Sequence, residues 1–160
     1  MKSFALVLLL ILSYTGYSQN LRTTFSKDYA RWKFDGNDFR TTFIDDYDDW
    51  RFKGMNIRTT FANDWDSWKV DSDVRMRTIF ANDFDQWEIK GHNFLVRVET
   101  VFHGDFSRWK ISGDADGEMR TIFSNDYERW DVDIDFGDLP EDMQAAVVFI
   151  AIFTSFRNNN

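Results

Sequence analysis

Hydrophobic and polar residues alternate along much of this chain with a period of two. Segment 21–25 (LRTTF) places Leu, Thr and Phe at alternate positions, and segment 32–34 (WKF) places Trp and Phe on either side of Lys. Alternation of this kind, in segments rich in Thr, Phe, Trp, Val and Ile, is typical of β-strands that present one apolar face. The pattern therefore predicts short strands in pairs, each pair joined by a polar loop.

This strand-loop-strand unit is repeated six times. Segments 40–52 (RTTFIDDYDDWRF), 58–70 (RTTFANDWDSWKV) and 120–132 (RTIFSNDYERWDV) are near copies of one another. The repeated residues are Phe25, Phe43, Phe61, Phe80, Phe102 and Phe123, followed by Trp32, Trp50, Trp68, Trp87, Trp109 and Trp130. Phe and Trp keep a constant separation while the units step by 18, 18, 19, 22 and 21 residues, which indicates a fixed hairpin and a variable connection. Parity predicts that Phe and Trp share one face.

Each predicted loop has six residues, such as 26–31, and contains an Asp that is followed directly by an aromatic residue. These are Asp28, Asp46, Asp64, Asp83, Asp105 and Asp126. A carboxylate at this position can accept hydrogen bonds from backbone N–H groups two or three residues later and so cap a short turn. We predict this structural role in preference to metal binding or catalysis. With Phe25 opposite Trp32, the same hairpin sets Arg22 opposite Asp35 on the outer face.

Two arrangements of the units fit this pattern. The hairpins either follow one another in an antiparallel meander, or each unit forms one rung of a parallel solenoid. In a solenoid, identical residues stack about 4.8 Å apart, which would pile six Asp side chains into one ladder and most of the Arg side chains into another. A meander separates equivalent residues by two strands, so we predict the meander.

The segment after Gly137 reads DLPEDMQAAVVFIAIFTSF and predicts a helix. Asp138 suits the cap and Pro140 the first turn. Residues 145–153 are apolar on every side, which a surface helix cannot tolerate, and 143–156 is too short to span a membrane. We predict that a curved sheet wraps this helix and buries it against the Phe and Trp side chains. An exposed tail that docks on a partner or membrane surface is the alternative, and closure of the sheet into a barrel stays open.

The N-terminus predicts a secretory signal peptide, residues 1–18, cleaved after Ser18. Lys2 precedes an unbroken apolar run over residues 4–12, and small or polar residues follow. The chain has no cysteine, so we expect neither a lipid-anchored leader nor disulfides. This indicates a periplasmic or secreted location.

Charge narrows the choice of partner. Without the predicted leader the chain carries 18 basic and 27 acidic side chains, a net charge of −9. A negative field of this size argues against nucleic acid or anionic lipid, both of which reward basic patches. A neutral glycan or a cationic peptide is compatible with it.

Catalytic signatures are scarce. His92 and His103 are the only histidines, and neither a Gly-rich phosphate loop nor a Ser-centred elbow occurs. Segment 114–118 (DADGE) is weakly similar to a calcium loop but lacks its spacing and its distant Glu, so it is predicted to be a hairpin turn. We predict no catalytic residue, no cofactor and no metal site.

Two sets of residues remain as candidate sites. In the fifth unit Glu99 replaces the usual Arg, His103 and Gly104 replace a polar pair, and His92 lies in the longest connection, so His92, Glu99 and His103 are a possible special site unless this unit has merely drifted. The second set is formed by the loop aromatics Tyr29, Tyr47, Trp65, Phe84, Phe106 and Tyr127. If exposed, these rings can stack on sugars or cationic side chains, whereas if buried they close the end of the sheet. Phe at two of the six positions favours burial.

Aromatic hairpin repeats of about twenty residues resemble, in outline, the choline-binding repeats of secreted cell-wall proteins. The Gly-Trp and Tyr-Tyr signatures of those repeats are missing here, so no ligand residue is carried over.

We expect an all-β protein: an antiparallel meander of six β-hairpins over residues 19–136, forming a curved sheet or barrel packed on one C-terminal helix. Residues 137–160, the helix and a polar tail, belong to the same fold. A non-catalytic binding module for a glycan or peptide is the predicted function. A structural or self-assembling envelope protein is the alternative, and an enzyme ranks third.

Overall fold

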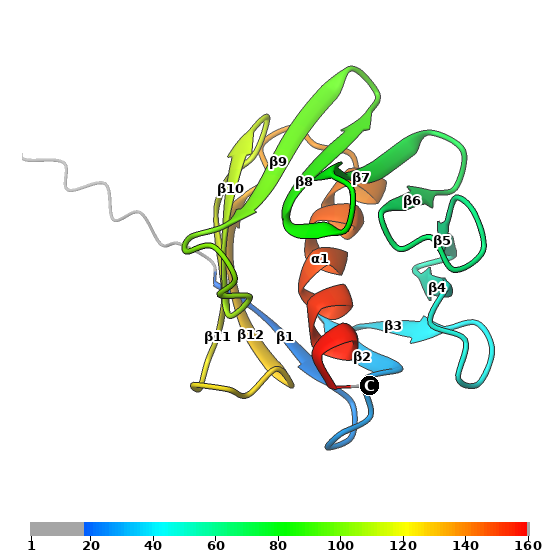
Figure 1. Ribbon diagram of the computed structural model, residues 1–160, viewed down its shortest axis with the longest axis vertical. Coiled ribbons are helices and arrows are strands. Elements are labelled where there is room, and N and C mark those ends of the chain that lie inside the picture. The colour runs from blue at the N-terminus through cyan, green and yellow to red at the C-terminus, as the bar shows by residue number, and fades with distance from the viewer. Residues whose placement is uncertain (1–17, 160) are drawn as a thin grey trace, which may run out of the picture.

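The computed structural model describes residues 18–159, so the predicted leader lies outside the described residues except for Ser18. This part of the chain forms twelve strands and one helix (Figure 1). The strands are β1 (Gln19–Thr23), β2 (Arg31–Phe34), β3 (Asn37–Thr41), β4 (Asp49–Phe52), β5 (Met55–Thr59), β6 (Ser67–Val70), β7 (Val74–Phe80), β8 (Asp83–Gly91), β9 (Phe94–Thr100), β10 (Arg108–Gly113), β11 (Asp116–Thr121) and β12 (Arg129–Asp135). The helix is α1 (Glu141–Asn159).

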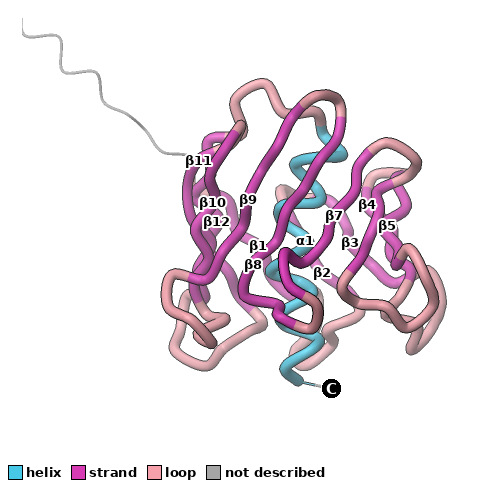
Figure 2. The backbone as a smooth tube through the Cα atoms, turned by 45° about the horizontal axis from the view of Figure 1, so that its top comes forward, coloured by secondary structure: helices cyan, strands magenta, loops and turns pink. Residues whose placement is uncertain are grey.

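The strands form one closed antiparallel barrel. Each strand pairs with the next along the chain, and β1 pairs with β12, where Leu21 lies opposite Trp130. Figure 2 shows the strands as a ring around the helix. The predicted meander of six hairpins is confirmed, and the closure that the sequence left open is complete. Successive copies are related as antiparallel hairpins and not as parallel rungs.

The predicted register is wrong by two residues. In the first hairpin Trp32 lies opposite Thr23, and Arg22 lies opposite Lys33, not Asp35. The reason is that β1 ends at Thr23, two residues before Phe25, and the chain turns there. The residue two places after each repeat Phe has a left-handed backbone; these are Lys27, Asp45, Asn63, Asn82, Gly104 and Asn125, with φ between 58° and 77°. A strand cannot continue through such a residue.

The repeat Trp and Phe do not share a face, contrary to the prediction from parity. All six Trp side chains point into the barrel and are at most 1% exposed. Five of the six repeat Phe residues lie in the loops and Phe80 is the last residue of β7; all six side chains are between 56% and 69% exposed. In five units the loop begins before Phe, and in the fourth the register shifts between Thr78 and Phe80. Parity counted along the sequence therefore does not report the orientation of Phe.

Helix α1 fills the barrel, as predicted. Met143 and every residue from Ala145 to Phe156 are buried, which explains why this helix is apolar on all sides. The helix begins at Glu141, so the expected cap Asp138 lies too early, and the Met143 N–H is instead bonded to the Asp142 carboxylate at 2.8 Å. Within residues 18–159, no helix has the length and apolar character needed to cross a membrane.

Candidate functional site

The six repeat loops lie at one end of the barrel, which we call the loop end. They connect β1–β2, β3–β4, β5–β6, β7–β8, β9–β10 and β11–β12, so alternate connections of the meander share this end. The C-terminal turns of α1 reach the same end, where Phe156 contacts Tyr47 and Trp65. The loop end is therefore the one place where all six repeats present equivalent residues together.

The loop aromatics line the inside of the loop end. Tyr29, Tyr47, Trp65, Phe84, Phe106 and Tyr127 are half-buried and pack against the core. Tyr47 has its ring centre 6.0 Å from that of Trp50 and 4.9 Å from that of Phe156. The structure thus gathers all six predicted residues into one ring around the end of α1, with only part of each ring facing solvent.

In five of the six units the backbone carbonyl of the loop aromatic also accepts a hydrogen bond from the repeat Trp. The Trp68 indole N–H donates to the Trp65 carbonyl at 2.8 Å, and the same bond occurs in the first, second, fourth and sixth units. The exception is Trp109 in the fifth unit, whose buried indole nitrogen has no hydrogen-bond partner among the described residues. The fixed spacing of three residues between the two aromatic positions follows from this bond.

The predicted capping role of the loop Asp residues is confirmed. Each of the six carboxylates accepts a hydrogen bond from the backbone N–H two residues later, at 2.9–3.2 Å. This is an Asx turn, which fixes the loop backbone. A second carboxylate, five residues after the repeat Phe, links one loop to the next: Asp66, for example, accepts from the Asn82 N–H at 3.0 Å.

Links of this kind join four of the six neighbouring loop pairs. Asp48, Asp66 and Asp85 reach the following loop, and Glu128 of the last unit reaches the Lys27 N–H of the first unit. The Glu128 link closes the ring of loops at the seam between β12 and β1. The Asx turns and these links therefore restrain the repeat loops and the side chains that project from them.

Asp85 is the most enclosed of these carboxylates, with 6% of its surface exposed. Burial opposes its ionisation, but hydrogen bonds from Thr100 and the Gly104 N–H, together with nearby His103, outweigh burial and lower the pKa of Asp85 below its ordinary value. His103 lies 3.2 Å from Asp85 and is itself largely exposed. His103 is thus an additional neighbour of a link that other repeats make without a histidine.

The structure does not bring His92, Glu99 and His103 together. His92 lies in the β8–β9 turn, at the end of the barrel opposite His103, and its Nε2 is 2.6 Å from the Asp142 carboxylate in the first turn of α1. That hydrogen bond raises the pKa of His92. Glu99 lies on the outer wall opposite Lys110. The three residues occupy three separate places on the barrel.

Segment 114–118 lies at the β10–β11 hairpin, as predicted. The Asp114 carboxylate accepts a hydrogen bond from the Leu95 N–H at 2.6 Å. Over residues 18–159, no group of three or more His, Cys, Asp or Glu side chains is arranged to hold a metal ion.

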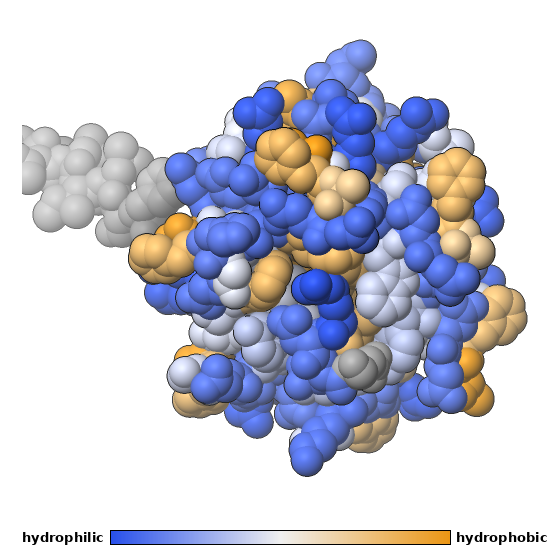
Figure 3. Space-filling model, viewed as in Figure 1, coloured by the Kyte–Doolittle hydropathy of each residue, from blue (hydrophilic) through white to orange (hydrophobic). Residues whose placement is uncertain are grey.

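The sequence prediction missed the most exposed feature of the loop end. The six repeat Phe side chains project from equivalent positions of the six loops, and we call them the Phe crown: Phe25, Phe43, Phe61, Phe80, Phe102 and Phe123. In Figure 3, apolar side chains are spaced around the edge of the molecule and separated by hydrophilic ones. At the inner ring of the same end, the Arg157 guanidinium lies 4.2 Å from the ring centre of Phe84. The Asn found two places after the repeat Phe in the third, fourth and sixth units was the sequence signal that could have indicated a turn there.

Comparisons with known proteins identify no relative. No protein-family model, no curated protein and no solved structure matches the chain.

Proposed function

We propose that the chain is a non-catalytic binding module of the periplasm or the extracellular space, and that the loop end is its binding surface. The observation that carries this proposal is the Phe crown, six large apolar side chains exposed at equivalent positions. Soluble proteins expose single apolar residues often, but an ordered set of six is typical of an interaction surface.

Rigidity of the loops supports the same proposal. Asx turns, left-handed residues and links between loops hold the crown in place before any ligand arrives. A preorganised surface loses less conformational entropy on binding than a flexible one. The loop aromatics serve as the inner support of this surface, and their exposed edges extend it toward the centre.

The crown suits ligands with apolar faces, such as the rings of a neutral glycan or the side chains of a peptide. Phenylalanine offers a flat face and no hydrogen-bonding group, so stacking provides the attraction. Acidic residues such as Asp45 and Asp64 belong to the same loops as the repeat Phe and favour a cationic peptide over an anionic one.

The alternative function, self-assembly in the cell envelope, cannot use pairing between the edge strands of two copies. All twelve described strands have two neighbours, so the barrel offers no free edge for pairing with another copy. We therefore rank binding above assembly, which would have to use the crown itself.

The test is a screen of residues 19–160 against glycan and peptide libraries, run beside a sizing column. We expect a monomer that binds a ligand. The triple variant F43S/F61S/F102S is expected to lose at least about tenfold in affinity, because each truncated anchor of an interface costs more than about 1 kcal/mol. F43Y/F61Y/F102Y keeps the rings and is the matched control. Equal binding by wild type and the Ser variant would contradict the proposal.

A further inference from the structure

The outer wall of the barrel has two halves that differ in how they pair charges. In every unit the residue three before the repeat Phe faces the residue after the repeat Trp across the hairpin. The first three pairs are all cationic: Arg22–Lys33, Arg40–Arg51 and Arg58–Lys69. The last three pairs combine opposite charges: Arg77–Glu88, Glu99–Lys110 and Arg120–Asp131.

In the second half of the wall most of the paired cations have a carboxylate partner, although Arg75 lies opposite both Lys69 and Lys90. Arg77 and Lys90 lie 2.9 Å and 2.8 Å from the Glu88 carboxylate, and Arg120 lies 3.0 Å from Asp131. The hydrogen bond from Lys90, with that from Arg77, lowers the pKa of Glu88 despite its partial burial. Cross-strand pairs of opposite charge stabilise a sheet, so this half needs no ligand to explain it.

The first half places cations side by side in rows. One row runs Arg129, Arg22, Lys33 across β12, β1 and β2, and a second runs Arg31, Arg40, Arg51 across β2, β3 and β4. Neighbouring strands lie about 4.8 Å apart, and like charges placed directly opposite destabilise a sheet. Lys33 is 2.7 Å from Asp38 and Arg31 is 3.6 Å from Asp28.

The other four cations of these rows form no ion pair with any residue between 18 and 159; they are Arg22, Arg40, Arg51 and Arg129. All four are exposed. Unpaired arginines in adjacent rows are a cost to the fold that an anionic ligand would remove.

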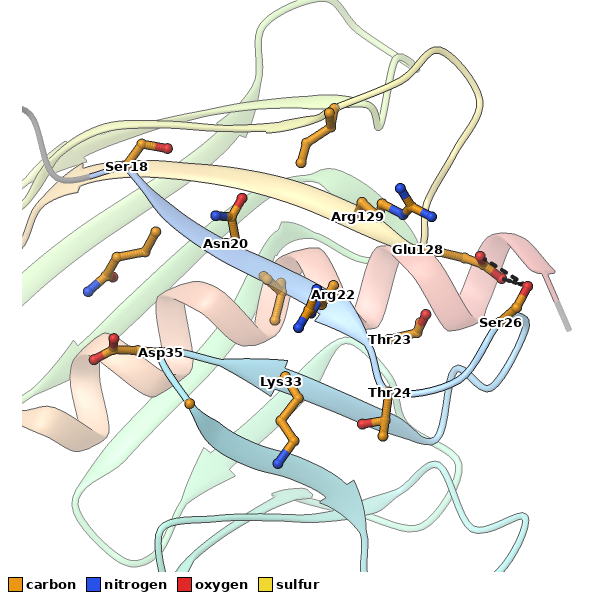
Figure 4. Close-up of a pocket in the computed structure, with 14 residues that line it drawn as sticks. Ser18, Asn20, Arg22, Thr23, Thr24, Ser26, Lys33, Asp35, Glu128 and Arg129 are labelled. Carbon is orange, nitrogen blue, oxygen red and sulfur yellow. Dashed lines mark hydrogen bonds between the residues drawn. The ribbon is translucent and has the colours of Figure 1, made fainter.

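Each row lines an open groove. The first groove has a volume of about 1350 Å³, and Figure 4 shows Arg22 on β1 between Arg129 of β12 and Lys33 of β2. The second groove, about 710 Å³, is lined by Arg31, Arg40 and Arg51 and bordered by the exposed rings of Phe25 and Phe43. Three carboxylates also line it: Asp28 and Asp38, which pair with Arg31 and Lys33, and Asp45. Glu128 and Asp35 lie at the edges of the first groove, where Glu128 is engaged by Lys27 and Ser26.

We propose that this wall, the outer face of β12 and β1–β4, binds a linear anionic polysaccharide that bears carboxylate, sulfate or phosphate groups. Arg guanidinium groups match such anions with paired hydrogen bonds. The two grooves lie side by side on neighbouring strands, so one extended polymer can cross both rows, and Phe25 and Phe43 offer stacking faces to its sugar rings. The site shares Phe25 and Phe43 with the Phe crown, but its cations lie on the wall, so R40Q/R51Q tests it separately from the loop end.

The net charge of −8 is compatible with this site. Charges further apart than about 10 Å are largely screened at 0.1 M salt, so the row of cations nearest the ligand dominates. A densely charged nucleic acid would also meet the acidic loops that flank the wall, whereas a polysaccharide with spaced charges meets them less. These observations favour the polysaccharide.

The experiment measures binding of residues 19–160 to a dextran sulfate of low substitution, whose sulfate groups are spaced apart along the polymer. Unsubstituted dextran is its neutral twin, and poly(dT) is the nucleic-acid probe. We expect binding to dextran sulfate, none to dextran, and weaker binding to poly(dT). R40Q/R51Q removes two charges of the second row and is expected to weaken dextran sulfate binding at least about tenfold.

The matched control is R97Q/K110Q, which removes two exposed charges from the other half of the wall. We expect it to change affinity by less than about twofold. Equal losses in the two double variants would show attraction to charge anywhere on the barrel and overturn the proposal. Failure to bind dextran sulfate, equal binding to dextran, or tighter binding to poly(dT) would also overturn it. Thermal unfolding supplies a second readout, because R40Q/R51Q relieves repulsion and should not lower the melting temperature.

Discussion

At the scale of single residues, the repeat Trp and the repeat Phe have opposite tasks. Trp68 fills the core with its ring and satisfies its N–H on the Trp65 carbonyl. Phe61, seven residues earlier, stands in solvent. The same motif thus contains one side chain that stabilises the core and one that is exposed at the surface. Truncating the Trp should lower the free energy of unfolding more than truncating the Phe.

The hydrogen bond of the repeat Trp can be weighed with a matched pair of variants. W68F removes an indole N–H that is bonded at 2.8 Å, whereas W109F removes one that has no partner in the described structure. Both lose the same volume in the core. We expect W68F to lower the free energy of unfolding by about 1–2 kcal/mol more than W109F, measured by urea denaturation. Equal losses would mean that the bond carries no net stability.

The alternation of residue types correctly predicted that the repeat Trp side chains point into the core, but it wrongly predicted the same for the repeat Phe side chains. Trp32 continues the alternation of β2, so its parity is a reliable guide. Phe25 lies in a loop that contains Lys27 in a left-handed backbone conformation. Lysine rarely adopts that conformation, so its presence does not predict the loop. The Asn residues at the equivalent positions of the third, fourth and sixth loops were the better signal.

At the scale of elements, the loops are held by carboxylates in two roles. Asp64 caps its own loop, and Asp66, two residues later, links to the next. The first role follows from local spacing and was predictable. The second was not, because it joins residues of different repeats whose distance depends on the hairpin register. The like-charge rows on the wall stayed hidden for the same reason, since Arg22 was assigned Asp35 as its neighbour.

The link from the Gly104 N–H to the Asp85 carboxylate should make the free energy of unfolding depend on pH in the acid range. The folded pKa of Asp85 is lower than its ordinary value of 3.8, so its contribution is present above that value and is lost as pH falls through the lower folded pKa. D85N is therefore expected to be less stable than wild type at pH 7, with the difference shrinking below about pH 4. Urea denaturation at pH 7, 5, 4 and 3 measures it. The exposed D116N is the control, and a difference that did not change with pH would contradict the prediction.

At the scale of the whole molecule, a buried helix replaces the second layer that a single sheet lacks. The apolar segment 145–153 allowed this to be predicted, since a helix without a polar side needs apolar surroundings everywhere. Closure was beyond prediction, because it depends on the accumulated tilt of twelve strands and on the Glu128 link between the last loop and the first.

The enclosure of α1 can be tested with one added charge. Ala146 is fully buried, so A146D sets a carboxylate among apolar side chains and is expected to cost several kcal/mol or to prevent folding. N158D adds the same charge at the exposed end of the same helix and should cost less than about 1 kcal/mol. Urea denaturation with near-ultraviolet circular dichroism of the Trp side chains measures both. A stable, folded A146D protein would contradict the enclosed position of the helix.

The order of these parts along the chain has a consequence for how the protein is made. β1 completes its pairing only when β12 has been synthesised. The six repeat Trp side chains are covered only when α1, which follows every strand, has been synthesised. A chain still being synthesised therefore exposes aromatic side chains that α1 will later cover, and the β1–β12 pairing joins the first strand to the last. We therefore expect the barrel to close only after α1 has been synthesised, and the incomplete chain to be prone to aggregation until then.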